Sequence, residues 1–317
     1  MAFLDKIKFI KHQLERELNT WELNNSEEYE LDRKAGDLIR ITHSIEKGLC
    51  ISNPRLGFGH EKQEKMMALI QELENSDSKY YMEARLMAEG ALKCYVDYHD
   101  EKGFSDEMIV EIKSFLKKRE LPENILEYGG CTKIKKNDML VSTTEIEKLF
   151  NTRHSIRNFS DEEVDHNLLR KAIILAQRAP SACNRQGVRV YVINHKNATV
   201  FKEWMNGTGG FEQAIKEFVL ITAKRSVYMP HEINQYIVSA SMYAAYLSLA
   251  LHAYGLGACV VQRSVVINEK WERIRKMLDI PGDEQAICLL GIGNLKDEYC
   301  VPVSHRLSEE VFLKFYK

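Results

Sequence analysis

Hydrophobic positions in the first 138 residues recur every three or four residues, which is the period of amphipathic helices. The pattern predicts helices over residues 3–22, 27–48, 60–75, 78–101 and 105–118. The next stretch, LPENILEYGGCTKIKKND (121–138), contains a proline, two adjacent glycines and a small lysine cluster, which is typical of a linker. The sequence therefore predicts an all-helical N-terminal region over residues 1–138.

The pattern changes from residue 139 onward, where short apolar runs alternate with helical periods. Runs of strand length and composition occur in VRVYVI (188–193), FVLITA (218–223), GACVVQ (257–262) and AICLLGIG (286–293). Helices are predicted between them at 199–205, 231–254 and 268–278. Residues 139–317 are therefore expected to form a mixed domain with a sheet whose faces are buried by helices.

A further helix is marked within FSDEEVDHNLLRKAIILAQRAPS (159–181). Ser160 is expected to cap its N-terminus, and Glu163 would complete a capping box. Pro180 stops the helix, because proline cannot continue the helical hydrogen-bond pattern.

Residues 237–254, IVSASMYAAYLSLALHAY, contain no Asp, Glu, Lys or Arg and are nearly long enough to span a bilayer. The segment is rich in Ser and Ala, carries His252 and has no basic flank that would set an orientation. We therefore expect a buried central helix and no membrane partner. The charged, amphipathic stretch MAFLDKIKFIKHQLEREL at the N-terminus lacks the continuous apolar core of a signal peptide.

Composition, charge and the absence of certain motifs argue against several classes of protein. Lys plus Arg is 44 and Asp plus Glu is 46, a net charge of -2, which argues against a nucleic-acid partner. Seven scattered cysteines without a closely spaced pair predict reduced, mostly buried thiols in a cytoplasmic protein and no metal site. The sequence also lacks a nucleophile elbow, an HExxH motif, a P-loop and a GxGxxG fingerprint after a strand.

The stretch NTRHSIRNF (151–159) places Arg153, Ser155 and Arg157 at alternate positions. In an extended segment these three side chains point to the same side. Two guanidinium groups and a hydroxyl group are a good receptor for a dianionic phosphate. Taken alone, the stretch is better explained as a solvated edge strand with ordinary surface charge.

Four stretches in order, across about residues 145–315, resemble the FMN-dependent nitroreductase superfamily. TRHSIRNF is similar to the family's opening Arg-x-Ser-x-Arg/Lys motif, and AQRAPSACNRQGVRVYVI to its Ala-Pro-Ser-x-x-Asn-x-Gln loop. SASMYAAYLSLALHAYGLGAC is similar to its long central helix, which ends in Gly-Leu-Gly. GIGNLKDEYCVPVSHRLSEEVF is similar to its closing strand end and following arginine.

The resemblance implies an α+β fold, a nitroreductase-like sheet flanked by helices with a long central helix, here preceded by the all-α N-terminal region. It also implies a homodimer with FMN at the subunit interface. Arg153 and Ser155 are expected to hold the phosphate or ribityl end of FMN, and Arg157 the N1–C2=O edge of the flavin. Arg306 resembles a second basic group on the phosphate. Ser304 stands where family members often have a lysine, so one phosphate contact is expected to be weaker.

The remaining cofactor-binding residues are also assigned by resemblance. A loop expected to reach the flavin from the partner subunit contains Pro180, Ser181, Asn184 and Gln186. The stretch after Gly-Leu-Gly, where the family usually places a small residue near flavin N5, here contains Gln262 and Arg263. An arginine beside the ring would change substrate access and flavin potential. The glycine-rich stretch WMNGTGGF (204–211) is either a loop at the cofactor or a plain connection.

The function implied is that of an FMN-dependent NAD(P)H oxidoreductase of nitroreductase type. NADH or NADPH would deliver hydride to flavin N5, and a small oxidised or conjugated substrate would then be reduced; no side chain is expected to be catalytic, because the flavin does the chemistry. One alternative is a flavin-dependent dehydrogenase or dehalogenase on the same scaffold. Another is a helical interaction protein with a degenerate flavin module.

The most unusual stretch of the helical region is THSIEKGLCISNPRLGFGHEKQEK (42–65). His43, Glu46 and Lys47 share one helix face there, followed by a Gly57–Phe58–Gly59 loop. One interpretation is a lid or substrate-reading surface over the flavin. The favoured interpretation is a salt-bridged helix end followed by an ordered turn.

Overall fold

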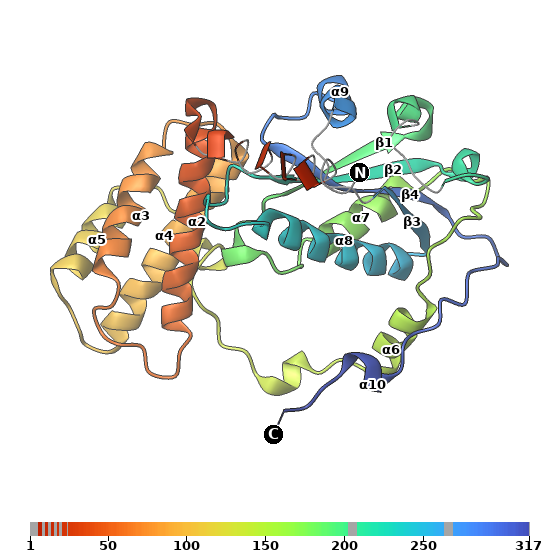
Figure 1. Cartoon of the computed structure of the whole chain (residues 1–317). Coiled ribbons are helices and arrows are strands. Elements are labelled where there is room, and N and C mark those ends of the chain that lie inside the picture. The colour runs from red at the N-terminus through yellow and green to blue at the C-terminus, as the bar shows by residue number, and fades with distance from the viewer. Residues whose placement is uncertain are drawn as a thin grey trace.

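The computed structural model describes residues 26–201, 208–262 and 269–316, together with scattered positions between 6 and 25. Helices gather at one end of the molecule, and a sheet flanked by further helices forms the other (Figure 1). The α+β fold class, with an all-helical N-terminal region before the sheet, is therefore confirmed.

The helical part contains α2 (Glu30–Leu49), α3 (His60–Glu72), α4 (Lys79–Glu101) and α5 (Glu107–Lys117), with a short 3-10 turn, η1 (Glu27–Tyr29), before α2. These bounds agree with the four predictions to within three residues. The helix predicted over 3–22 falls largely outside the described residues. Each helix turns its apolar stripe inward, and the shared core contains the fully buried Leu38, Ile45, Met66, Leu92 and Ile109.

The sheet consists of β1 (Val188–Asn194), β2 (Glu217–Lys224), β3 (Leu256–Gln262) and β4 (Glu284–Asn294). All neighbouring strands are antiparallel, in the order β1-β2-β4-β3, and the four predicted strands are confirmed. Side chains of β2 alternate between two cores: Val219 and Ile221 face α7 (His166–Ala176) and α8 (Gln235–Ala253). Phe218 and Leu220 face η5 (His195–Phe201) and α9 (Glu269–Met277).

The start of α7 differs from the prediction. Asp165 is its N-cap and accepts a hydrogen bond from the Asn167 amide at 2.7 Å, so the expected Ser160–Glu163 capping box is wrong. The reason is that the chain before α7 is bonded to the end of β4. The Ser160 amide donates to the Asn294 carbonyl at 3.0 Å, and Phe159 forms a bridge with Leu295.

Only one face of α8 is buried, so the expectation of a fully buried central helix is wrong for the other face. Tyr243, Leu247 and Leu251 pack against the sheet. Val238, Met242 and Tyr246 are 45%, 43% and 44% exposed. In the part of the chain that the structure describes, no helix has the length and apolarity needed to cross a bilayer.

Residues 131–142 have exposed side chains and connect the helical part to α6 (Thr143–Thr152). We retain as a proposal that the boundary between regions 1–138 and 139–317 lies there, because few buried contacts hold such a segment. At the other end of the chain, an extended and largely exposed segment follows β4 and includes the short α10 (Glu309–Phe312).

The helical part docks on the sheet through α2. A Cβ added at Gly36 would lie 2.5 Å from the Val227 carbonyl oxygen, so the two backbones approach closely there. One turn earlier, Asp32 lies 2.9 Å from the Lys224 ammonium at the end of β2, and Tyr81 of α4 donates to the same carboxylate at 2.9 Å. The contact between the two parts therefore combines backbone proximity with a buried ion pair.

We expect Gly36→Ala to destabilise the protein by about 1–3 kcal/mol, because the added methyl group meets backbone that cannot move aside alone. In a helix with free space, the same change would stabilise by about 0.8–1 kcal/mol. Urea unfolding measures the difference. Gly209→Ala is the control, since a Cβ there meets nothing within 4 Å. A Gly36→Ala protein as stable as the parent or more stable would contradict the close approach.

Candidate functional site

The segment from Arg153 to Arg157 is extended and lies against β3. Arg153 ends α6 with φ -71° and ψ 118°, and Ser155 forms a parallel bridge with Ala258. The Ile156 amide donates to the Ala258 carbonyl at 3.0 Å, and the Ile156 side chain is buried. Alternation along the extended chain therefore directs Arg153, Ser155 and Arg157 away from that core.

Both arginines of this segment lack a carboxylate partner within the described residues. Arg157 is exposed, and its Nη1 donates to the Ser155 carbonyl at 3.3 Å. Its guanidinium lies 6.0 Å from the centre of the Phe211 ring. Phe211 ends the glycine-rich stretch, whose residues 204–207 lie outside the described ones. Two uncompensated guanidinium groups and a hydroxyl group suit a dianionic ligand.

His252 connects this segment to the C-terminal end of α8. Its Nε2 lies 2.8 Å from Thr152 Oγ1, and the Thr152 hydroxyl donates its proton to the Lys148 carbonyl. Burial lowers the pKa of His252, and the positive charges of Arg153 and His154 lower it further. The site therefore holds a neutral imidazole beside its arginines at neutral pH.

The loop expected to reach the flavin is built from strained backbone. Cys183, Asn184 and Gln186 have φ values of 51°, 57° and 50°, in the left-handed region that residues with a side chain seldom occupy. Ser181 Oγ accepts from the Gln186 amide at 3.1 Å, and Gln177 donates to the Gln186 side chain at 3.1 Å. Pro180 and the Asn184 side chain are exposed. The loop is thus held in one conformation that presents Asn184 outward.

Arg185 anchors this loop, and the sequence interpretation did not select it. Its side chain is 1% exposed and forms a two-pronged ion pair with Glu232. The guanidinium also lies 4.5 Å from the centre of the Tyr228 ring. The Glu232 carboxylate raises the pKa of Arg185 and Arg185 lowers that of Glu232, both against burial. No local sequence pattern marks the pair, because 47 positions separate its members.

The two predicted groups lie at opposite ends of α8. The Arg153 segment adjoins its C-terminal end through His252, whereas the loop adjoins its N-terminal end through a 3.2 Å bond from the Ala182 amide to Ser239. These contacts are roughly 20 Å apart along the axis, at 1.5 Å per residue. One chain therefore does not bring the Arg153 segment and the loop together.

The remaining predicted residues are not brought to this segment either. Ser304 and Arg306 are exposed in the chain after β4, and Ser304 has φ 46°. No contact in the described residues joins them to Arg153. The backbone of Gln262 ends β3 opposite Leu289, while its side chain and all of Arg263 lie outside the described residues.

The stretch over residues 42–65 forms the favoured helix end and turn. His43 Nδ1 lies 3.2 Å from Glu46, whose other oxygen accepts from the Gly130 amide at 3.1 Å. Gly57 and Gly59 have positive φ, and the Gly57 amide donates to His99 Nε2 at 3.0 Å. These contacts confirm the interpretation as an ordered turn within the helical part.

Most of the cysteines are at least partly accessible to solvent. Cys259 and Cys288 are buried, whereas the other five cysteines are half-buried or exposed, so the prediction of mostly buried thiols is wrong. In the same residues, His, Cys, Asp and Glu side chains form no group of three that could hold a metal ion.

The family model of the nitroreductases matches residues 151–236 and 214–294. The part of the chain that carries the sheet is a nitroreductase-family domain. The matched segments contain the Arg153 segment, the loop and all four strands, and they leave residues 1–150 and 295–317 uncovered.

Solved structures similar to this nitroreductase-family domain cover about half of the chain. The FMN-dependent nitroreductase from Clostridium difficile R20291 is 24% identical, over 53% of this chain and 98% of its own, with a TM-score of 0.44. A nitroreductase from Desulfovibrio desulfuricans in complex with FMN is 20% identical, over 56% and 99%, with a TM-score of 0.45. A nitroreductase family protein from Streptococcus pneumoniae TIGR4 is 21% identical, over 54% and 100%, with a TM-score of 0.45.

We expect His252 to titrate below its ordinary pKa of 6.5, and Arg153→Gln to move this pKa upward, because the substitution removes a nearby positive charge. The unfolded chain would take up this proton at a higher pH than the folded chain. The free energy of unfolding therefore falls as pH drops through about 6.5. Titration of the His252 ring protons by NMR measures the pKa.

Arg170→Gln is the control for this titration, because Arg170 is an exposed residue on α7. An unchanged His252 pKa in Arg153→Gln, or an equal change in both variants, would show that Arg153 does not lie beside His252.

Proposed function

We propose that the protein is an FMN-dependent oxidoreductase of nitroreductase type that acts on a small molecule. The observation that carries the proposal is the Arg153–Arg157 segment. Within the region that matches the family model, this segment is bonded to β3 with two guanidinium groups that have no carboxylate partner among the described residues. Such a segment fits an anionic cofactor tail, since guanidinium groups bind phosphate oxygens through paired hydrogen bonds.

The residues of this chain would divide the cofactor between them. Arg153 and Ser155 would hold the phosphate or ribityl end, and Arg157 would place a positive charge near the N1 edge of the ring. Arg306 and Ser304 would complete the phosphate site. When bound, FMN supplies hydride transfer at N5, with NADH or NADPH as the proposed donor and a small oxidised or conjugated molecule as the acceptor.

A homodimer is part of the proposal, because one chain separates the two groups of predicted residues. In a symmetric pair, the loop with Pro180, Ser181, Asn184 and Gln186 can meet the Arg153 segment of the other subunit. The exposed apolar face of α8 supports this arrangement, as do Phe150 of α6 and Val303, Phe312 and Phe315 near the C-terminus. Apolar surface of this extent usually marks an interaction site. Cytoplasmic localisation remains a proposal from the sequence.

Purified protein distinguishes this function from its alternatives. We expect a yellow dimer with bound FMN. Under anaerobic conditions, NADH or NADPH should reduce the flavin and remove its yellow colour. Colour without bleaching by either nucleotide would favour a dehydrogenase or dehalogenase on the same scaffold. A colourless protein that takes up no added FMN would leave a helical interaction protein with a degenerate flavin module.

We expect Arg153→Ala and Arg306→Ala each to weaken FMN binding by about 1–3 kcal/mol, the contribution of a charge-assisted hydrogen bond. Titration of apoprotein with FMN, followed by flavin fluorescence, gives the dissociation constants. Arg170→Ala removes an equal charge from the exposed side of α7 and should leave them unchanged. FMN binding as tight in both test variants as in the control would exclude this site.

A further inference from the structure

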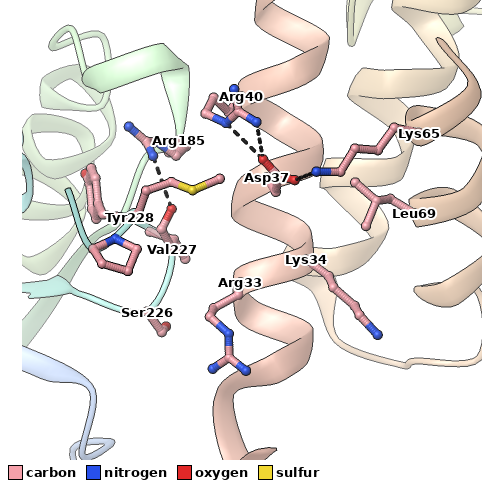
Figure 2. Close-up of a pocket in the computed structure, with 12 residues that line it drawn as sticks. Arg33, Lys34, Asp37, Arg40, Lys65, Leu69, Arg185, Ser226, Val227 and Tyr228 are labelled. Atoms are coloured by element: carbon pink, nitrogen blue, oxygen red, sulfur yellow. Dashed lines mark hydrogen bonds and ion pairs between the residues drawn. The ribbon is translucent and has the colours of Figure 1, made fainter. Parts of the chain in front are cut away.

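A pocket of about 400 Å³ lies between the helical part and the loop after β2. One wall is formed by α2 and α3, and the opposite wall by residues 226–230 (Figure 2). A volume of this size is typical of sites for small organic molecules. The pocket lies outside the Arg153 segment and has no role in the proposed flavin chemistry.

The two walls differ in character. The loop presents Val227, Tyr228, Met229 and Pro230, and Leu69 of α3 adds a further apolar side chain. The side chains from α2 and α3 are mostly basic, namely Arg33, Lys34, Arg40 and Lys65, and Asp37 is the one acidic residue among the described ones that line the pocket. A ligand that satisfies both walls has an apolar body and a negatively charged group.

Ion pairs do not neutralise the basic wall. Asp37 is shared, because its carboxylate accepts from both Arg40 and Lys65. Arg33 Nη1 donates to two carbonyl groups, those of Leu23 at 3.1 Å and Ser26 at 2.7 Å, and no described carboxylate pairs with it. Lys34 differs, since Glu30 and Glu72 both lie within 2.5 Å of its ammonium.

The excess positive charge therefore belongs to Arg33 and to the Arg40–Asp37–Lys65 cluster, whereas Lys34 with Glu30 and Glu72 carries one excess negative charge. In this cluster, two cations share one anion. The Lys65 side chain is 53% exposed, so its ammonium can turn toward a bound ligand at little cost. Guanidinium and ammonium groups at the mouth of a partly apolar cavity bind carboxylates and phosphates more tightly than they do in open solvent.

We propose that this pocket binds a small organic anion, with its carboxylate or phosphate group at the Arg40–Asp37–Lys65 cluster and its apolar body against residues 227–230. Buried Arg185, which lines the same pocket, belongs to the strained loop that carries Asn184. The pocket is therefore built on the same rigid support as that loop. Binding of the anion does not depend on the proposed flavin function.

Calorimetric titration with 2-naphthoate tests the proposal, with 2-naphthalenemethanol as the neutral molecule of the same shape. We expect the anion to bind about tenfold more tightly than the alcohol, the effect of one charge-assisted contact. Added salt should reduce this preference, because the side chains at the pocket mouth are partly exposed. Equal affinity for the two molecules, or no binding of naphthoate, would overturn the proposal.

Two substitutions in the shared cluster should act in opposite directions. Lys65→Gln should weaken naphthoate binding about fivefold, whereas Asp37→Asn should tighten it by a similar factor, because it frees two cations. Lys93→Gln is the matched control, since Lys93 pairs with Asp97 on α4 and does not line the pocket.

If the cluster had only a structural role, Lys65→Gln and Asp37→Asn would change the affinity for naphthoate in the same direction. That result would overturn the proposal. The same holds if Lys65→Gln behaves like Lys93→Gln. Urea unfolding of each variant confirms that the compared proteins are folded. The affinity for naphthoate is measured independently of the FMN content of the preparation. Failure of the flavin proposal and failure of this one are therefore distinguishable.

Discussion

The Lys224 ammonium lies between two buried carboxylates, 2.9 Å from Asp32 of α2 and 3.1 Å from Asp283 before β4. Buried charges are costly unless each meets its partner, so this cluster admits one docking position of the helices on the sheet. Asp32 and Gly36 are four positions apart on the same face of α2. The ion pair and the close approach of Gly36 to Val227 therefore set the same register. In another register, a charge would be buried alone or two backbones would collide.

This register places the helical part beside the loop of the nitroreductase-family domain. Tyr80 of α4 donates to the Arg185 carbonyl at 3.4 Å, and the Arg189 guanidinium lies 5.1 Å from the centre of the Tyr80 ring. The pocket that we propose for an organic anion also exists only in this register, because its basic wall comes from α2 and α3 and its apolar wall from the loop after β2. The N-terminal helices thus contribute to the surroundings of the candidate site.

Much of the fold could be predicted from local patterns. The helices α2 to α5 and the four strands follow from periodicity, since a stripe of Leu, Ile and Met needs only the helical repeat to form a face. The start of α7 was mispredicted because Ser160 and Glu163 satisfy the capping rule locally. In the folded protein the Ser160 amide is instead bonded to the Asn294 carbonyl, and the helix begins after Asp165. The exposed face of α8 was missed for a related reason: an apolar sequence does not show which side packs against the sheet.

The sequence by itself determined most of the secondary structure, the family resemblance and the alternation of Arg153, Ser155 and Arg157, because each depends on neighbouring residues and their spacing. Only the tertiary structure decided that the loop and the arginine segment lie at opposite ends of α8, that Arg185 is buried against Glu232, and that basic residues of α2 and α3 face an apolar loop. These features join positions far apart in the chain. Their partners are selected by packing and charge burial, which no local pattern encodes.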